Sequence, residues 1–450
     1  MVEKILANLE RSNCVTDSTF MQAVSEVLHS LEPIANSDPR YDTFAILERL
    51  VTPDRMIQFK VQWVDDQNHV HVNNGYRIQF NNSLGPYKGG LRFHPSVTAG
   101  VLKFLAFEQI FKNSLTGLPI GGAKGGSDFD PKGKSDFEIM KFCRAFMREL
   151  HQYIGSRIDV PAGDIGVGTR EIGFLYGEYK RITRNYDGVL SGKPYTFGGS
   201  LLRPEATGYG VVYFAQEMLK QELEEVLEDQ ICVVSGAGNV AIHTIEKLQH
   251  FGAKVVTCSD SEGAVYDPDG IDLALLKTLK GNGKRFSLDH YVSHRENAVY
   301  TKKSDYPAGG HAVWHIPCFA AFPCATQNEL TLIDAYALVK NGCVAVIEGA
   351  NMPTEPSAVD LFLEEGVLFA PGKASNAGGV AVSEFEMSQN ASMEKWSYEK
   401  VDAKLNEIMC QIYKRVALTA KEYGKERNFV DGANIAAFKR LAEAMILEGV

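Results

Sequence analysis

The sequence lacks a long apolar run, a signal-peptide core and an excess of basic residues, and each absence excludes a class of protein. No apolar stretch is long enough to span a bilayer. The first residues, Met1 to Arg11, are charged and carry no apolar signal-peptide core. The formal net charge is −10 and the pI is about 5.6, so the basic footprint of a nucleic-acid-binding protein is missing. We therefore expect a cytoplasmic protein that has neither a membrane nor a nucleic acid as a partner.

The sequence also lacks paired cysteines. Its eight cysteines are scattered, and none forms a Cys-x-x-Cys pair. Cys318 and Cys324 have no second pair and no histidine cluster nearby, so the spacing typical of a zinc site is absent. His69 and His71 alternate along a strand-like run, but two histidines alone are a weak ligand set. We expect no metal, and we expect cysteines that are small buried residues of a reducing compartment.

What is present is the composition of an ordinary globular protein, with 45% hydrophobic and 23% charged residues. A chain of 450 residues is too long for one hydrophobic core, so two domains are expected. Proline and glycine interrupt the stretch from Leu201 to Gly210, which we interpret as the crossing between them. The first domain is thus expected at 1–200, and the second begins at 201.

Both halves of the chain alternate helical and strand patterns, which predicts the α/β class. Apolar residues up to about residue 50 recur with a spacing near 3.6, which is typical of helices. Residues 57–64 and 69–81 alternate apolar and polar side chains and predict two strands joined by a turn. Further helices are expected at 95–114, 135–154 and 432–446.

One lysine stands between two glycine pairs in the stretch LPIGGAKGGSDFDP, which begins at Leu118. Glycine lets a ligand approach the backbone closely, so the ammonium of Lys124 can stand in a cleft. Lys88 and Lys112 lie in similar polar or glycine-rich surroundings, and three converging lysines would attract a dicarboxylate. Their repulsion would lower the pKa of the most buried one, which could then act as a base. The alternative is an ordinary charge on a turn.

A carboxylate follows in PAGDIGVGTREIG, which begins at Pro161. Asp164 stands among glycines on a loop after an apolar segment, and it could serve as a proton carrier. Taken alone, this residue could equally be an Asx-turn or a helix N-cap.

The second half contains a dinucleotide-binding fingerprint. A short apolar strand at 231–235 runs directly into Gly-x-Gly-x-x-Ala at 236–241, a helix follows, and the next strand ends near Asp260. A strand, glycine turn, helix and strand with an acid about twenty residues on is the pattern that cradles a pyrophosphate. Three later loops, at 321–328, 344–353 and 374–383, are expected at the same nucleotide-binding edge of a parallel sheet.

Three stretches resemble the signature segments of hexameric glutamate dehydrogenases in the Glu/Leu/Phe/Val dehydrogenase superfamily. They are GPYKGGLRFHPSV, which begins at Gly85, LPIGGAKGGSDFDP and PAGDIGVGTREIG. The likeness runs over nearly the whole chain, with the motifs in a fixed order. It implies an α/β substrate and oligomerisation domain at 1–200 plus 425–450, because the C-terminal helix of the family returns to the first domain. It also implies a Rossmann-like dinucleotide-binding domain at 201–424, with the active site in the cleft between the two. The partners implied are glutamate, 2-oxoglutarate, ammonium and further copies of the chain in a homohexamer.

The resemblance also assigns roles to residues. Lys124 matches the lysine that activates water against an imine, and Asp164 matches the aspartate that moves a proton at the amine. Lys88 and Ser383 match the pair that grips the side-chain carboxylate, and Gln109, Lys112 and the backbone of Gly163 match the contacts to the α-carboxylate. The other expected substrate-side residues are Gly89, Gly90, Arg203 and Val380. The expected cofactor-binding residues are Thr207, Ser235, Gly236, Ala237, Gly238, Asn239, Val240, Ser259, Asp260, Ser261, Lys284, Arg285, Ala325, Thr326, Asn351 and Asn376.

The cofactor is expected to be NADP, with NAD as second choice. Asp260 alone would favour NAD, because an acid there holds the ribose hydroxyls and repels a 2′-phosphate. However, Ser259 and Ser261 flank it with hydroxyl donors, and Lys284 and Arg285 could close over a phosphate. The segment also resembles that of NADP-linked glutamate dehydrogenases. The alternative is that the two basic residues form only a solvated loop.

Two other functions stay open at this point. A branched-chain or aromatic amino-acid dehydrogenase would resemble this chain, but Lys88 favours an acidic substrate side chain, since a buried lysine facing an apolar group is costly. A non-catalytic dinucleotide-binding protein would not need Lys124 and Asp164. Glu384, which directly follows Ser383, departs from the family pattern and is expected to weaken the carboxylate contact unless it points away.

Overall fold

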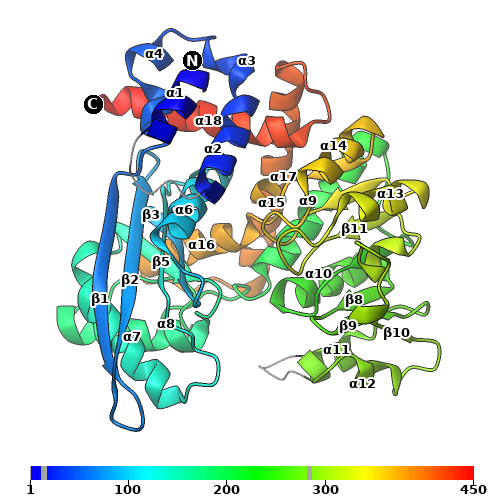
Figure 1. The fold of residues 1–450 in the computed structure, drawn as a ribbon, viewed down its shortest axis with the longest axis horizontal. Coiled ribbons are helices and arrows are strands. Elements are labelled where there is room, and N and C mark those ends of the chain that lie inside the picture. The colour runs from blue at the N-terminus through cyan, green and yellow to red at the C-terminus, as the bar shows by residue number, and fades with distance from the viewer. Residues whose placement is uncertain (1, 12–17, 281–285) are drawn as a thin grey trace. The chain divides into compact units, whose positions relative to one another are not determined.

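The structure is a computed structural model that describes residues 2–11, 18–280 and 286–450 (Figure 1). Its internal contacts divide the chain into two compact units. The first unit comprises Met1–Arg203, Val380–Asp402 and Asn434–Val450, and the second comprises Pro204–Gly379 and Ala403–Ala433. Each unit combines a sheet with helices, so the predicted α/β class is confirmed.

The elements alternate along the chain as expected for this class. The strands are β1 (Arg55–Val64), β2 (Val70–Asn81), β3 (Tyr87–Phe93), β4 (Gly122–Ser127), β5 (Asp159–Gly163), β6 (Ile231–Val234), β7 (Lys254–Val255), β8 (Thr257–Ser259), β9 (Gly263–Tyr266), β10 (Val299–Lys302), β11 (Ala320–Phe322), β12 (Ala345–Ile347) and β13 (Leu368–Ala370). The helices are α1 (Val2–Arg11), α2 (Ser18–Ser30), α3 (Glu32–Ala35), α4 (Arg40–Thr43), α5 (Ile46–Leu50), α6 (Ala99–Leu115), α7 (Asp136–Leu150), α8 (Thr169–Thr183), α9 (Ala206–Leu223), α10 (Asn239–His250), α11 (Leu273–Lys280), α12 (Asp289–Val292), α13 (Leu332–Lys340), α14 (Pro356–Glu364), α15 (Gly372–Ser375), α16 (Gly378–Ser392), α17 (Tyr398–Glu422) and α18 (Phe429–Glu448).

The first unit is built on a mixed five-stranded sheet with the order β1-β2-β4-β3-β5. β1 and β2 form the antiparallel pair that the alternating pattern predicted, whereas β3 runs parallel to both β4 and β5. The sequence patterns predicted no strand for the glycine-rich segments around Lys88 and Lys124, and they left a charge on a turn as the alternative for Lys124. Both lysines lie on strands, because the glycines let these strands pack closely against their neighbours.

The two faces of this sheet are covered differently. Leu91 of β3 is level with Gly125 of β4, and Leu91 belongs to the apolar core built with α7 and α8. Successive side chains of a strand point to opposite faces, so Lys124 points to the other face. α6 packs against β2 and β4, with Ile110 of α6 directly above Gly122. The glycines of β4 therefore let a helix lie close to the strand that carries Lys124.

The second unit contains a parallel five-stranded sheet with the order β13-β12-β11-β6-β7. A small antiparallel sheet, β10-β9-β8, lies in the same unit. From β6 the chain goes to β7 on one side, while β11 pairs with the other side of β6. The strand order therefore reverses between β6 and β11, and a switch point of this kind binds ligands at the carboxyl ends of its strands.

None of the described helices combines the length and the apolar character that a membrane span requires.

We expect Gly122→Ala to destabilise the protein by about 1–3 kcal/mol, the usual cost of adding bulk to a packed core. A Cβ at this position would lie 2.3 Å from Cγ2 and 2.9 Å from Cα of Ile110, and the helix backbone cannot move away easily. Gly177→Ala is the control, because a Cβ there has nothing within 4 Å and α8 should gain up to about 1 kcal/mol in helix propensity. Denaturant unfolding of both variants measures the difference, and equal midpoints would contradict the packing argument.

Candidate active site and dinucleotide-binding edge

A buried ion pair organises the sheet of the first unit. Arg77 of β2 and Asp159 of β5 are both fully buried and paired through two hydrogen bonds, of which Nε to Oδ2 measures 2.8 Å. The same guanidinium donates to the carbonyl of Gly89 on β3 at 3.2 Å, and Gln79 donates to Asp159 at 3.0 Å. Side chains of β2 thus fix the relative positions of β3, which carries Lys88, and β5, which directly precedes Asp164.

Lys124 and Asp164 contact each other in the first unit. Nζ of Lys124 lies 3.2 Å from Oδ2 of Asp164, and Nε of Arg92 donates to the same oxygen at 2.8 Å. Lys124 is buried, and Asp164 and Arg92 are each less than a fifth exposed. Sequence reasoning missed Arg92, because an arginine two residues after a glycine pair has no distinguishing pattern.

Burial and neighbouring charges set the protonation of this pair. Burial lowers the pKa of Lys124, the charges of Arg92 and Arg77 lower it further, and Asp164 opposes them. Burial alone would raise the pKa of Asp164, but the cations Lys124 and Arg92 outweigh it and hold that pKa below the ordinary value. A lowered pKa is what a general base needs. For Lys124 its main cause is burial and not repulsion between lysines.

Lys88 is fully buried, and none of its hydrogen-bond partners among the described residues is a carboxylate. Its Nζ donates to the carbonyl of Val160 at 3.0 Å and to the hydroxyl of Ser191 at 2.6 Å. Burial lowers its pKa well below the ordinary value, and the nearby cations Arg203, Arg77 and Lys193 add to the effect, while Glu386 opposes it. The ammonium therefore faces neutral oxygens in a cationic environment, which favours the binding of an external anion.

Ser383 meets Arg203 and not Lys88 in this structure. Nε of Arg203 donates to the hydroxyl of Ser383 at 2.9 Å, and Ser383 is almost completely buried on α16. Glu384 accepts a hydrogen bond from Ser388, one turn further along the same helix, at 2.8 Å. The carboxylate next to Ser383 is thus engaged along the helix.

A second buried ion pair holds the segment that carries Ser191. Nζ of Lys193 lies 2.8 Å from Glu386 of α16, and both side chains are about 1% exposed. Glu386 also accepts the backbone N–H groups of Gly192 at 2.8 Å and of Lys193 at 3.3 Å. Sequence reasoning missed Ser191, Lys193 and Glu386, because their partners are distant in the chain and none lies in a recognisable motif.

The residues expected near the α-carboxylate lie on α6 and on the glycine-rich strands. Gln109 donates to Asn113 at 2.7 Å, and Asn113 donates to the carbonyl of Lys88 at 3.1 Å. Lys112 lies in the last turn of the same helix. A Cβ at Gly89 would lie 1.6 Å from the carbonyl oxygen of Ala123, so a side chain there is excluded. The other expected members are Gly90 on β3, Gly163 on β5 and Val380 on α16.

The dinucleotide fingerprint forms the expected turn between β6 and α10. Gly236 has φ +87°, which favours glycine, and Gly238 is the N-cap of α10. Ser259 accepts the N–H of Gly236 at 2.8 Å and so fixes the turn to the end of β8. Ala237, Asn239 and Val240 complete this turn and the first residues of the helix. Backbone N–H groups at such a helix start are donors for a pyrophosphate.

Asp260 forms an ion pair that the sequence did not reveal. Its Oδ2 lies 2.6 Å from Nζ of Lys280 on α11, and both side chains are less than 15% exposed. Its Oδ1 accepts the N–H groups of Glu262 at 2.9 Å and Gly263 at 3.2 Å. Ser261 is exposed beside it. Lys284 and Arg285, which sequence reasoning assigned to the phosphate, lie outside the described residues.

Polar groups at the other strand ends suit a bound dinucleotide. Asn376 donates to the carbonyl of Ala350 at 3.0 Å and to the side chain of Asn351 at 3.1 Å, and its own Oδ1 is buried without a hydrogen-bond partner. Ala325 and Thr326 are exposed on the loop after β11, and Thr207 is half-buried on α9. A buried acceptor without a donor and a glycine turn at a helix start both fit the nicotinamide dinucleotide.

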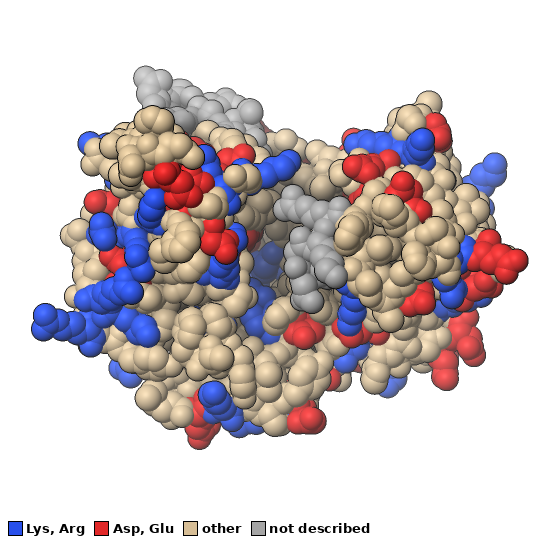
Figure 2. All heavy atoms as spheres, turned by 90° about the horizontal axis from the view of Figure 1, so that it is seen from below, with Lys and Arg blue, Asp and Glu red and all other residues tan. Residues whose placement is uncertain are grey.

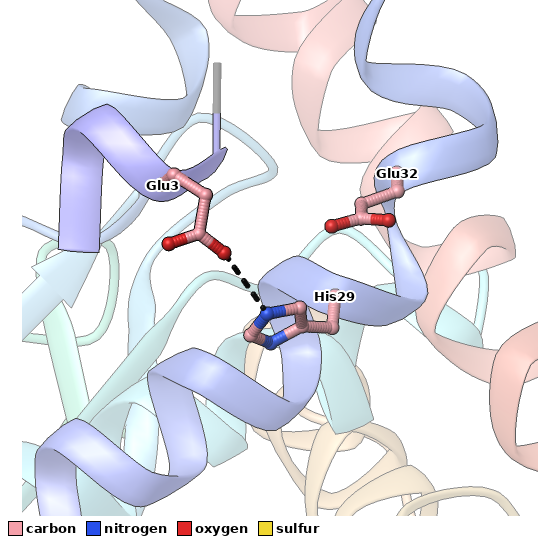
Figure 3. Close-up of side chains that lie close together, drawn as sticks. All are labelled: Glu3, His29 and Glu32. Atoms are coloured by element: carbon pink, nitrogen blue, oxygen red, sulfur yellow. Dashed lines mark ion pairs between the residues drawn. The ribbon is translucent and has the colours of Figure 1, made fainter.

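Two surface features carry no site. Figure 2 shows basic and acidic side chains interspersed over the face it draws, among the described residues. Glu3, His29 and Glu32 lie close together at the surface, and Figure 3 shows the carboxylate of Glu3 directed at the ring of His29, with Nε2 to Oε1 at 3.5 Å. All three are exposed, so water competes with any ion, and we assign no metal site to them.

Comparisons with known proteins agree with this geometry. The family model described as glutamate/leucine/phenylalanine/valine dehydrogenase matches residues 198–449, and the dimerisation domain of the same family matches residues 53–181. The chain therefore belongs to the Glu/Leu/Phe/Val dehydrogenase family, and the family inferred from the sequence motifs is confirmed.

Similar proteins match over the full length. The chain is 59% identical over 449 residues to the NADP-specific glutamate dehydrogenase of Helicobacter pylori, with all of both chains covered. A solved structure of glutamate dehydrogenase from Plasmodium falciparum has a TM-score of 0.95 at 49% identity and covers 100% of this chain and 94% of that one. The hetero-hexameric glutamate dehydrogenase of Thermus thermophilus, in its Leu-bound form, has a TM-score of 0.84 at 27% identity and covers 96% and 97%.

Proposed function

We propose that this chain is an NADP-linked glutamate dehydrogenase, which oxidatively deaminates L-glutamate to 2-oxoglutarate and ammonium and also catalyses the reverse reaction. The observation that carries the proposal is the burial of Lys88, whose hydrogen-bond partners in the described part of the chain are neutral oxygens. A buried ammonium without a counter-ion is costly, and the side-chain carboxylate of glutamate would supply the missing charge. The full-length similarity to NADP-specific glutamate dehydrogenases supports the same substrate.

The residues of the first unit can carry the proton transfers. NADP, when bound, supplies the acceptor for the hydride that leaves the substrate α-carbon, and an iminium remains. Lys124, whose pKa is lowered by burial, takes a proton from the water that adds to this carbon. Asp164, which is ionised, accepts and returns a proton at the amine nitrogen. Ammonium then leaves and 2-oxoglutarate is formed.

The other substrate classes are less well supported. A branched-chain or aromatic amino acid would bring an apolar side chain to Lys88, and its ammonium would stay without a counter-ion. A non-catalytic protein would have no use for the buried contact between Lys124 and Asp164. The direct experiment is the change in nicotinamide absorbance with 2-oxoglutarate and ammonium. A branched-chain oxo acid in place of 2-oxoglutarate tests the alternative, and faster turnover with it would overturn the proposal.

We expect Lys124→Ala and Asp164→Asn each to lower kcat by about 10²–10⁴-fold, the usual contribution of a positioned acid or base. The two side chains also contact each other, so either substitution could affect folding. Circular dichroism and unfolding curves must therefore accompany the kinetics. Lys132→Ala is a suitable control, because it removes an exposed lysine from the same unit. Turnover close to the wild-type rate in Lys124→Ala would sink this assignment.

We expect Lys88→Leu with Ser383→Val to shift the preference from glutamate towards norleucine. Losing a hydrogen bond to a charged group costs about 1.5–3 kcal/mol, which is roughly a tenfold to hundredfold loss of kcat/KM for glutamate. Lys112→Leu is the matched control, because a residue at the α-carboxylate affects both amino acids alike. An unchanged ratio of the two kcat/KM values in the double variant would refute the assignment of Lys88 and Ser383 to the substrate side chain.

We further propose that Lys280 enables the use of NADP by neutralising Asp260. Without it, the carboxylate would repel the 2′-phosphate and favour NAD. We therefore expect Lys280→Ala to lower the ratio of kcat/KM for NADPH over NADH by about tenfold or more, the worth of a charge-assisted contact. Lys277→Ala is the control, because that lysine of the same helix pairs with Glu246. The variant Lys284→Ala/Arg285→Ala tests the sequence-based assignment in the same assay, and a larger effect there would favour it.

We propose a homohexamer that works in the cytoplasm. The support is the name of the dimerisation domain that matches residues 53–181 and the hexameric assembly of the Thermus thermophilus relative. Met56, Val64, Val70 and Val72 on β1 and β2 are 39–68% exposed, and such an apolar strand pair needs cover. Light scattering of the purified protein measures the assembly.

A further inference from the structure

Glu329, which lies just beyond the loop after β11, joins two loops of the second unit. Its Oε1 accepts the hydroxyl of Ser235 at 2.9 Å and the backbone N–H of Ala325 at 2.9 Å. The backbone of Thr326 also hydrogen-bonds to this carboxylate. Ser235 directly follows β6, whereas Ala325 and Thr326 follow β11. One partly buried carboxylate thus connects the ends of two neighbouring parallel strands.

The two connected loops lie at the switch point of the sheet. The strand order reverses between β6 and β11, and the carboxyl ends of strands at such a point bind ligands. Ser235 also accepts the backbone N–H of Cys324 at 2.9 Å, and Gly236 of the fingerprint follows it directly. The loop that presents Ala325 and Thr326 is exposed, so Glu329 and Ser235 restrain a surface loop from behind.

Glu329 titrates in the neutral range. Burial raises its pKa to about 7, the negative charge of Asp334 adds to the rise, and the hydrogen bonds from Ala325, Ser235 and Thr326 offset only part of it. The other titratable neighbours are the thiol of Cys324 and the hydroxyl of Tyr306. Burial raises the pKa of both, so both stay neutral between pH 6 and 8. Two histidines belong to the neighbouring turn, whose Trp314 donates its ring N–H to the carbonyl of Glu329: burial lowers the pKa of His311 to about 4, and His315 lies 3.5 Å from Asp334.

Folding stability does not explain why an ionised carboxylate is kept here. A carboxyl whose folded-state pKa is raised stabilises the fold fully below its unfolded pKa, and this contribution is lost as the pH rises through about 7. At pH 8 the ionised group therefore lowers the stability of the protein without cofactor. The hydrogen bonds that it receives connect the loops that follow β6 and β11.

We propose that Glu329 is a positioning residue for the dinucleotide and that its ionised carboxylate holds the two loops in the conformation that binds NADP(H). The inference rests on the proposed cofactor function. Protonation converts one acceptor into a donor, so the donors of Ser235, Ala325 and Thr326 share fewer lone pairs. The loops then loosen, and cofactor affinity falls as the pH drops through the neutral range.

The test is the dissociation constant of NADPH, followed by its fluorescence, for the wild type and Glu329→Gln at pH 6 and pH 8. NADH is titrated in parallel, because it has no 2′-phosphate that changes its charge in this range. We expect the wild type to bind both coenzymes about tenfold more weakly at pH 6, the worth of one hydrogen bond to a charged group. Glu329→Gln should bind NADH with an affinity that does not depend on pH, and its KM for NADPH at pH 8 should rise more than its kcat falls.

Two further variants keep the proposal falsifiable. Glu365→Gln removes an exposed carboxylate at the end of α14 and should behave as the wild type does. Ser235→Ala removes the bridging hydroxyl and keeps the carboxylate, so binding should weaken at pH 8 while its pH dependence remains. If Glu329→Gln keeps the wild-type pH dependence, the proposal is overturned. If the wild type binds neither coenzyme at pH 8, the cofactor assignment itself fails.

Discussion

The ion pair between Arg77 and Asp159 is the contact on which the substrate side of this protein depends. Both groups are fully buried, and desolvating them costs several kcal/mol per ion unless the hydrogen bonding is complete. Here the carboxylate also receives Gln79, and the guanidinium also donates to the carbonyl of Gly89. Separating such a pair leaves a buried unpaired charge, so a shift in the register of β2, β3 and β5 would be strongly destabilising. Lys88 and Asp164 take their positions from that register.

The glycines next to the lysines act through the same packing. β4 is buried along its whole length. The glycines let α6 and the neighbouring strands approach, which removes water from around Lys88 and Lys124. Desolvation is the largest cause of the lowered pKa of both lysines. The lowered pKa that a base requires thus follows from the small size of the neighbouring glycines, which carry no functional group.

How far the sequence could predict the structure depended on the range of the interactions involved. The turn after β6 and the pairing of β1 with β2 were predictable, because turn residues and alternation act over a few neighbours. The strands β3, β4 and β5 were missed, since glycine has a low strand propensity and only tertiary packing stabilises it there. Ser191, Glu386 and Lys280 were missed for a related reason. Each meets its partner across a distance in the chain, and a lysine on an amphipathic helix gives the same pattern whether it is solvated or paired.

Three of the carboxylates of this chain show how the surroundings adapt the same functional group to different tasks. Asp164 has two cations within 3.2 Å, which overcome the effect of burial and keep it ionised. Asp260 has a single lysine and two backbone donors and lies at the end of a strand. Glu329 has a hydroxyl and backbone donors as hydrogen-bond partners within the described ranges and no cation, so burial raises its pKa. Because dipoles stabilise a charge less than an adjacent cation does, Glu329 changes its charge near pH 7, whereas Asp164 stays ionised. The proton transfers proposed for Asp164 need a group that is ionised before the substrate arrives, whereas a carboxylate that only restrains loops can tolerate titration.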